Sequence, residues 1–244
     1  MLTIGKMNGE IHYPKPPIRE AMLDFRCPAK RTPGPELDFR LTQLADKFAA
    51  EFSARQTTVL DASQESPKAF GITLRQSPER YVWQIRRDGM LLSRLPVYTS
   101  WDEVEEFGSR LWAGYREAVP QAAVSELVVR AINEIRLPAG QVDLREFVRT
   151  YPHVSDEIAE PINRFAMNLG FPIGEPSGQA NITLAPGVSQ TFGTMALLLD
   201  ITVMCRDTAA IDKDCWHVAR QLRNHRNRIF EASITDKLRE TFND

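Results

Sequence analysis

Two stretches of eight residues decide the fold: AMLDFRCP at positions 21–28 and AINEIRLP at positions 131–138. Laid over each other, they share the first Ala, the Arg and the final Pro, and both carry an acid at the fourth position and a large apolar residue at the fifth. In the first stretch, apolar side chains alternate with Met22, Asp24 and Arg26, which is the pattern of a strand with one buried face. The offset of 131 − 21 = 110 residues indicates an internal repeat.

The segments around these stretches repeat one order of elements. After the first stretch, periodicity and turn signals predict a helix over 36–54, strands over 57–61, 69–76, 80–87 and 90–95, and a helix over 101–119. The second stretch lies in a predicted strand over 124–137, followed by helices over 143–149 and 155–163, strands over 165–172, 179–184 and 194–205, a helix over 211–232 and a shorter helix from 233. The same offset carries the helix over 101–119 onto 211–229.

This order predicts an α+β fold made of tandem duplicated helix-grip-like units. Each unit is expected to be a strand, a helix, an antiparallel meander and a second helix, with helices packed on one face of an antiparallel sheet. We expect an N-terminal arm over 1–15, a first unit over 16–122 and a second unit over 123–244.

Charges in the two matching stretches suggest how the units meet. The first strands of the two units could pair antiparallel across a pseudo-twofold axis. The residue numbers of facing positions in such a pair add to a constant. For a constant of 160, Asp24 faces Arg136 and Arg26 faces Glu134. Opposite charges on facing positions stabilise a pair of strands by roughly 0.2–1 kcal/mol. We therefore predict these two polar pairs between the units.

Composition excludes several classes of protein. The 244 residues include 30 Lys and Arg against 32 Asp and Glu, a net charge of −2, and 43% of them are hydrophobic. This is ordinary globular composition, with no overall electrostatic footprint for nucleic acid or an anionic membrane. The three cysteines form no CxxC pair, which argues against a disulfide framework or a thiolate zinc site. No long apolar run is present, so we expect a cytoplasmic protein that does not associate with membranes.

Sequence signatures of catalysis are missing. The chain has no GxSxG, no GxxxxGK[ST], no GxGxxG after a strand and no HExxH. His217 and His225 are eight residues apart on a predicted helix, about 12 Å along its axis and too far for one metal ion. We therefore predict no catalytic residue, no cofactor and no metal site, and we consider an enzyme the less favoured class.

Arginines supply the candidate binding residues. Those on the last long helix are Arg220, Arg223, Arg226 and Arg228, and those at the end of a meander strand are Arg86 and Arg87. The helix arginines form a ridge suited to phosphate or carboxylate contacts. The alternative is a solvated helix face whose bases complement the helix dipole, and we favour this alternative.

Two further polar and aromatic features have structural explanations. Tyr81, Trp83 and Ile85 share one face of a strand, so we expect the aromatic rings to face the helices rather than stack on nucleic acid. Asp200 interrupts an otherwise apolar strand and must find a partner if it is buried. It is either bonded across the sheet, which we favour, or the lone polar group of a pocket.

Three segments resemble a sporadically distributed bacterial family of about this length. They are PPIREA at 16–21, VRAINEIRLP at 129–138 and FEASITDKL at 230–238, so the resemblance spans essentially the whole chain. The family has no assigned activity, so the resemblance implies no catalytic residue.

The prediction for function is a non-catalytic binding or interaction protein that uses a concave sheet or a sheet–helix groove. We expect a protein partner or a homo-oligomer, with a small-molecule ligand as a further option. One alternative is a nucleic-acid-binding saddle that uses the arginine clusters, which the net charge disfavours. Another is an enzyme with a pocket between the sheet and the long helix, using acids such as Asp24, Glu134 or Asp200.

Overall fold

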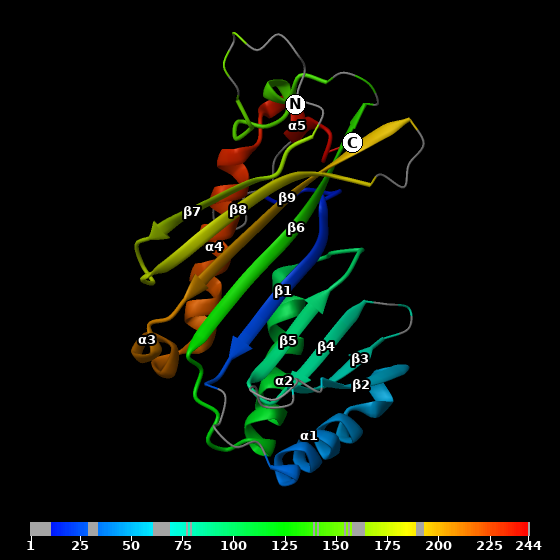
Figure 1. Cartoon of the computed structure of the whole chain (residues 1–244), viewed down its shortest axis with the longest axis vertical. Coiled ribbons are helices and arrows are strands. Elements are labelled where there is room, and N and C mark those ends of the chain that lie inside the picture. The colour runs from blue at the N-terminus through cyan, green and yellow to red at the C-terminus, as the bar shows by residue number, and fades with distance from the viewer. Residues whose placement is uncertain are drawn as a thin grey trace.

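Nine strands form one antiparallel sheet in the order β2-β3-β4-β5-β1-β6-β9-β8-β7 (Figure 1). The computed structural model describes residues 11–28, 34–60, 69–76, 78, 80–138, 140, 142–153, 155, 157, 164–188 and 193–243. The strands are β1 (Ile18–Arg26), β2 (Ala54–Leu60), β3 (Ala69–Arg75), β4 (Tyr81–Arg86), β5 (Gly89–Arg94), β6 (Glu126–Pro138), β7 (Met167–Ile173), β8 (Gly178–Gly187) and β9 (Thr194–Cys205). The helices are α1 (Pro35–Lys47), α2 (Trp101–Ala118), α3 (Thr208–Lys213), α4 (Cys215–Ser233) and α5 (Asp236–Glu240), with 3-10 turns η1 (Ala49–Glu51) and η2 (Leu144–Glu146). The predicted α+β class with antiparallel strands is confirmed.

The two matching stretches lie side by side at the centre of the sheet. β1 pairs antiparallel with β6, and Ala21 lies directly opposite Ala131. Strands β2–β5 extend the sheet on one side of this pair and β7–β9 extend it on the other (Figure 1). Residues of both predicted units therefore contribute to a single sheet.

The register of this central pair differs from the prediction. Asp24 lies opposite Val128, and Arg26 lies opposite Glu126, so facing positions sum to 152 rather than 160. Strand length explains the difference, because β6 ends at Pro138. At a sum of 160 the first residues of β1 would face positions beyond that end, whereas the observed register pairs nearly all of β1. The predicted pairs Asp24–Arg136 and Arg26–Glu134 are therefore wrong.

Helices α1, α2 and α4 pack on one face of the sheet (Figure 1). Alternate residues of β1 point to these helices, and the ring of Phe25 stacks on Trp112 of α2 with 4.5 Å between centroids. The prediction that Tyr81 and Trp83 face the helices is confirmed, because both are buried in this core. The helices α2 and α4 also contact each other through an ion pair between Glu105 and Arg220.

Several element boundaries differ from the predictions for local reasons. The predicted helix over 211–232 is divided at Asp214, whose carboxylate accepts hydrogen bonds from the backbone N–H groups of Trp216 and His217 and so begins α4. The first helix ends at Lys47, short of the predicted 54, and the predicted helix over 143–149 is reduced to η2. Most of the predicted helix over 155–163 and of the predicted arm over 1–15 lies outside the described residues.

The described end of the predicted arm packs against the C-terminal helices. The hydroxyl of Tyr13 donates to both carboxylate oxygens of Glu231, at 2.8 and 3.0 Å, and burial together with this carboxylate raises the pKa of Tyr13. Lys15 N–H donates to the carbonyl of Phe242. The two ends of the described chain thus meet at the same end of the sheet. No described helix is both long and apolar enough to cross a membrane.

Candidate functional site

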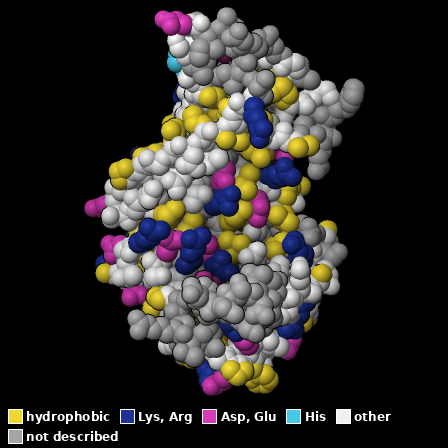
Figure 2. Space-filling model, viewed as in Figure 1, with side chains coloured by type: hydrophobic (Ala, Val, Ile, Leu, Met, Phe, Trp, Pro, Cys, Tyr) yellow, Lys and Arg dark blue, Asp and Glu magenta, His cyan; other side chains and the backbone are white. Residues whose placement is uncertain are grey.

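The face of the sheet opposite the helices is the candidate functional surface. The described helices leave this face uncovered, and it is turned toward the viewer in Figure 2. Arginine and acidic side chains gather across its middle, with hydrophobic side chains between them (Figure 2). Met22, Asp24 and Arg26 point to this face because they alternate with the core residues of β1. We call it the open face.

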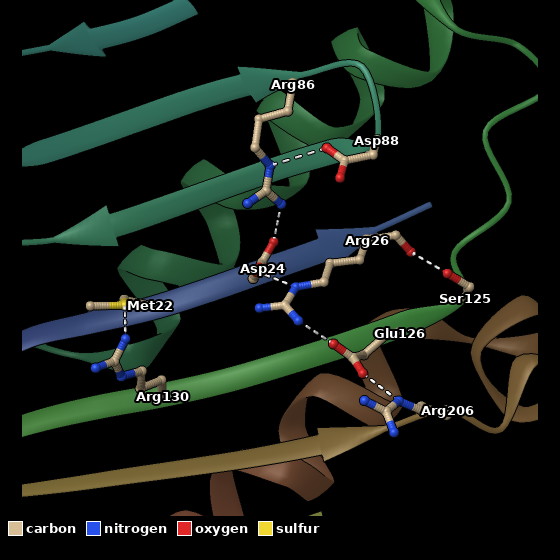
Figure 3. A network of polar contacts seen from close by, with 9 residues as sticks. All are labelled: Met22, Asp24, Arg26, Arg86, Asp88, Ser125, Glu126, Arg130 and Arg206. Atoms are coloured by element: carbon tan, nitrogen blue, oxygen red, sulfur yellow. Dashed lines mark hydrogen bonds and ion pairs between the residues drawn. The ribbon is translucent and has the colours of Figure 1, made fainter. Parts of the chain in front are cut away.

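A chain of alternating charges crosses the open face (Figure 3). Asp24 on β1 accepts hydrogen bonds from Arg86 of β4 and, at 2.8 Å, from Nε of Arg26. Glu126 on β6 accepts a 2.5 Å hydrogen bond from Nη1 of Arg26 and another from Nε of Arg206. Each carboxylate therefore joins two guanidinium groups, and Arg26 joins the two carboxylates. We call these five residues the charged chain.

Strand register places Arg86, Arg26, Glu126 and Arg206 in one row, and Asp24 lies two residues along β1 from Arg26. Arg26 pairs directly with Glu126 on one side and with Gly89 on the other. Arg206 follows the last paired residue of β9, so it extends the row opposite Glu126. The row thus runs across the sheet, perpendicular to the strands, because directly paired residues on one face are neighbours.

Burial makes the two carboxylates anchors for exposed arginines. Asp24 and Glu126 are only 4% and 6% exposed, whereas the side chains of Arg26 and Arg206 are 50% and 69% exposed. A buried carboxylate is costly unless it is paired and hydrogen bonded, and the arginines meet this requirement. These three arginines and two acids carry a net charge of 3 − 2 = +1, and Arg86 also lies 3.6 Å from the carboxylate of the exposed Asp88. Burial alone would lower the pKa of Arg26, but hydrogen bonds to Asp24 and attraction by both acids raise it.

A second ion pair lies on the same face. Arg130 of β6 donates to both carboxylate oxygens of Asp200 on β9, from Nε at 2.8 Å and from Nη2 at 2.5 Å. Its Nη1 also contacts the sulfur of Met22 at 3.9 Å. The predicted bond of Asp200 across the sheet is therefore present, and it raises the pKa of Arg130.

A recess adjoins one end of the charged chain. It is an open hollow of about 430 Å³, lined by Ser177, Gly178, Gln179, Met204, Arg206 and Asp207. These residues come from the start of β8 and the end of β9. Arg206 belongs to both the recess and the charged chain, so its exposed guanidinium group lies at the edge of the recess.

The other arginine and acid candidates on the sheet have separate partners. Arg87 makes a double hydrogen bond to Asp38 of α1, at 2.7 and 2.6 Å, and so holds a helix rather than facing the open face. Glu134 binds Arg19 at 3.0 Å and approaches Arg136 of its own strand at 3.4 Å. Of the predicted sheet residues, the structure therefore brings Arg86, Asp24 and Arg26 together in one group and Glu134 and Arg136 in another.

The predicted arginine ridge on α4 is divided among different environments. Arg220 binds Glu105, and Arg226 is only 4% exposed, with its guanidinium 5.7 Å from the ring centre of Trp101. Arg228 is exposed, whereas Arg223 is half-buried. Arg226 is therefore not part of the solvated helix face that the sequence favoured, because α4 packs against α2 on the side where it lies. Binding of an anion by the remaining arginines of α4 stays a prediction.

Sequence reasoning missed Glu126 and Arg206. Both lie at strand ends, and neither stands out in the sequence until the register of β6 and β9 places them opposite each other. Within the described ranges, no group of three His, Cys, Asp or Glu side chains could hold a metal ion. On the open face, each carboxylate of the charged chain is bonded to arginines, and Arg26 and Arg206 expose the rest of their guanidinium groups. Exposed guanidinium groups are suited to binding anionic groups.

Comparison of the chain with models of protein families finds no match, and comparison with curated proteins also finds none. The family resemblance of the three sequence segments therefore stays a prediction. Any assignment of function has to come from the site itself.

Proposed function

We propose that this chain is a non-catalytic binding protein whose open sheet face receives a partner protein. The observation that carries the proposal is the charged chain, in which buried acids hold exposed arginines on a face that the described helices leave uncovered. Arginine is favoured at protein interfaces because its planar guanidinium binds carboxylates through two hydrogen bonds. Anchoring reduces the conformational entropy that such a side chain loses on binding.

The two alternatives have weaker support. A nucleic-acid-binding saddle needs a surface with a large net positive charge, whereas the charges of Arg26, Arg86, Arg130 and Arg206 are each offset by a bound carboxylate. An enzyme needs a free acid, base or nucleophile near a cleft. Asp24, Glu134 and Asp200 instead accept hydrogen bonds from arginine. The space between the sheet and α4 is also filled by apolar side chains such as Leu222 and Val203.

Site-specific photo-cross-linking in the native host tests the proposed surface. We expect a photoreactive residue at Gln84 or Asn181, on the open face of β4 and β8, to form adducts with a partner. The matched controls are Ala113 of α2 and Asn224 of α4, which are exposed on the helix layer. Adducts at the helix positions and none at the sheet positions would move the binding surface to the other side of the molecule.

We also propose that the two halves derive from one duplicated unit. The first strand of each half, β1 or β6, lies at the centre of the sheet. Its neighbour on the outer side is the last strand of the same half, β5 or β9. A long helix, α2 or α4, comes after that last strand in the chain. The direct pair of Ala21 and Ala131, which the offset of 110 residues relates, marks where a pseudo-twofold axis would pass. The halves differ in strand number, since β2–β5 in the first correspond to β7–β9 in the second.

Division of the chain tests whether the halves behave as units. We expect residues 1–122 and 123–244, co-expressed as separate chains, to associate through β1 and β6, because these strands pair along most of their length. Co-purification through a tag on one half, followed by circular dichroism, measures this. A cut inside α2, between Gly108 and Ser109, is the control and should abolish assembly, because both pieces lose part of the buried helix face. Equal assembly from both cuts would contradict the proposed boundary.

A further inference from the structure

We propose that the recess at the end of the charged chain is a binding site for a small oxyanion, through a phosphate or carboxylate group held by Arg206 and Arg26. This site goes beyond the proposed function, since a small anion could bind there whether or not the open face receives a partner protein. Two observations carry it: the recess of about 430 Å³ has the exposed Arg206 in its lining, and the exposed Arg26 binds the same carboxylate, that of Glu126.

Both arginines keep donors that the protein does not use. Arg206 donates to Glu126 through Nε alone, so among the described residues neither of its Nη groups has an acceptor. Arg26 donates to Asp24 through Nε and to Glu126 through Nη1, and its Nη2 has no acceptor among the described residues. Guanidinium N–H groups that face solvent from fixed positions are suited to the oxygens of phosphate or carboxylate.

Glu126 acts as a positioning residue for this site. Its carboxylate is buried, and its two oxygens bind Arg26 and Arg206, one each. The two guanidinium groups are therefore held next to each other, although their positive charges repel. An anion that contacts both guanidinium groups would relieve this repulsion. Because Glu126 already holds both side chains, they would lose little conformational entropy when the anion binds.

The lining of the recess fits a small polar ligand. Ser177 and Gln179 offer a hydroxyl and an amide, and Met204 offers an apolar wall. The acid in the lining, Asp207, caps α3 by accepting from the N–H of Ala210 at 3.1 Å, so one of its oxygens is already bonded.

Calorimetric titration of the full chain with inorganic pyrophosphate and, separately, with citrate tests the site. We expect saturable binding of at least one anion with a stoichiometry of one, and the tighter of the two identifies phosphate or carboxylate as the group recognised. Arg206→Gln should weaken that binding by about tenfold or more, because it removes a charge-assisted double contact. Ser177→Glu, which leaves the charged chain intact and adds a negative charge to the recess, should weaken it similarly.

Arg136→Gln is the matched control. The side chain of Arg136 is 65% exposed, close to the 69% of Arg206, and it also approaches a glutamate on the open face, but it lies outside the recess. We expect binding within about twofold of the unchanged protein, since only general charge is altered. Equal losses in Arg206→Gln and Arg136→Gln, or no saturable binding of either anion, would overturn the proposal. Thermal unfolding of each variant shows that a loss of binding is not a loss of fold.

Discussion

Gly89→Ala is expected to lower the free energy of unfolding by about 3–5 kcal/mol, through left-handed backbone strain and a direct clash. Gly89 begins β5 with φ of 129°, a conformation that residues with a side chain rarely adopt. A Cβ atom there would lie 1.9 Å from the carbonyl oxygen of Phe25, well inside van der Waals contact. The substitution therefore cannot be accepted without moving β1 or β5.

The surroundings of Gly89 oppose such a movement. Gly89 pairs with Arg26 on one side and with Arg86 on the other, so it lies between two members of the charged chain. Cys27 N–H donates to the carbonyl of Asp88 at 2.7 Å, which fixes the turn against β1. Phe25 itself is fully buried and stacked on Trp112. Relief of the clash would thus disturb the core as well as the open face.

Gly140→Ala separates the two causes of instability. Gly140 also has a positive φ, of 111°, but a Cβ atom there would meet nothing within 4 Å. Its substitution should cost about 1 kcal/mol, the strain alone. Urea unfolding of both variants, followed by circular dichroism, measures the difference. A Gly89→Ala loss no larger than that of Gly140→Ala would show that β1 and β5 can separate at this point at little cost.

Local sequence patterns predicted most elements of the sheet, because they depend on neighbouring residues. The alternation in β1 involves only neighbouring residues, and the predicted strands match β1 and β3–β9 within a few positions. Register is different in kind. The register of β1 with β6 depends on where β6 ends relative to β1, and these strands are more than a hundred positions apart in the sequence.

The same distinction explains the candidate site. Asp24, Arg26 and Arg86 were named from sequence, but the partners assigned to the first two were wrong because the register was wrong. Glu126 and Arg206 became visible only through the pairing of β6 with β9. For Arg226, the spacing along the helix predicted an exposed side chain. In the structure its guanidinium is buried over the ring of Trp101 on the neighbouring helix α2.

Asp24→Asn is expected to lower the free energy of unfolding by about 2–3 kcal/mol. Removal of one partner from a buried ion pair costs about 3–5 kcal/mol when the remaining charge stays buried. Here the side chain of Arg26 is half exposed and that of Arg86 is 26% exposed, so water can solvate part of the released charge and reduce the cost. Glu117→Gln, at an exposed pair with Lys47, is the control and should change stability by less than about 0.5 kcal/mol.

A double-mutant cycle shows whether Asp24 acts through the arginines. Asp24→Asn leaves three arginines against Glu126 and the exposed Asp88, so added salt should recover part of the lost stability by screening the repulsion between the arginines. Arg86→Gln in the same chain should also recover part of it, giving a coupling energy of about 1 kcal/mol or more between positions 24 and 86. Additive losses without any effect of salt would mean that Asp24 matters for its packing in β1 and not for its charge. In that case the exposed arginines would be held by the strands themselves, and the buried acids would not be their anchors.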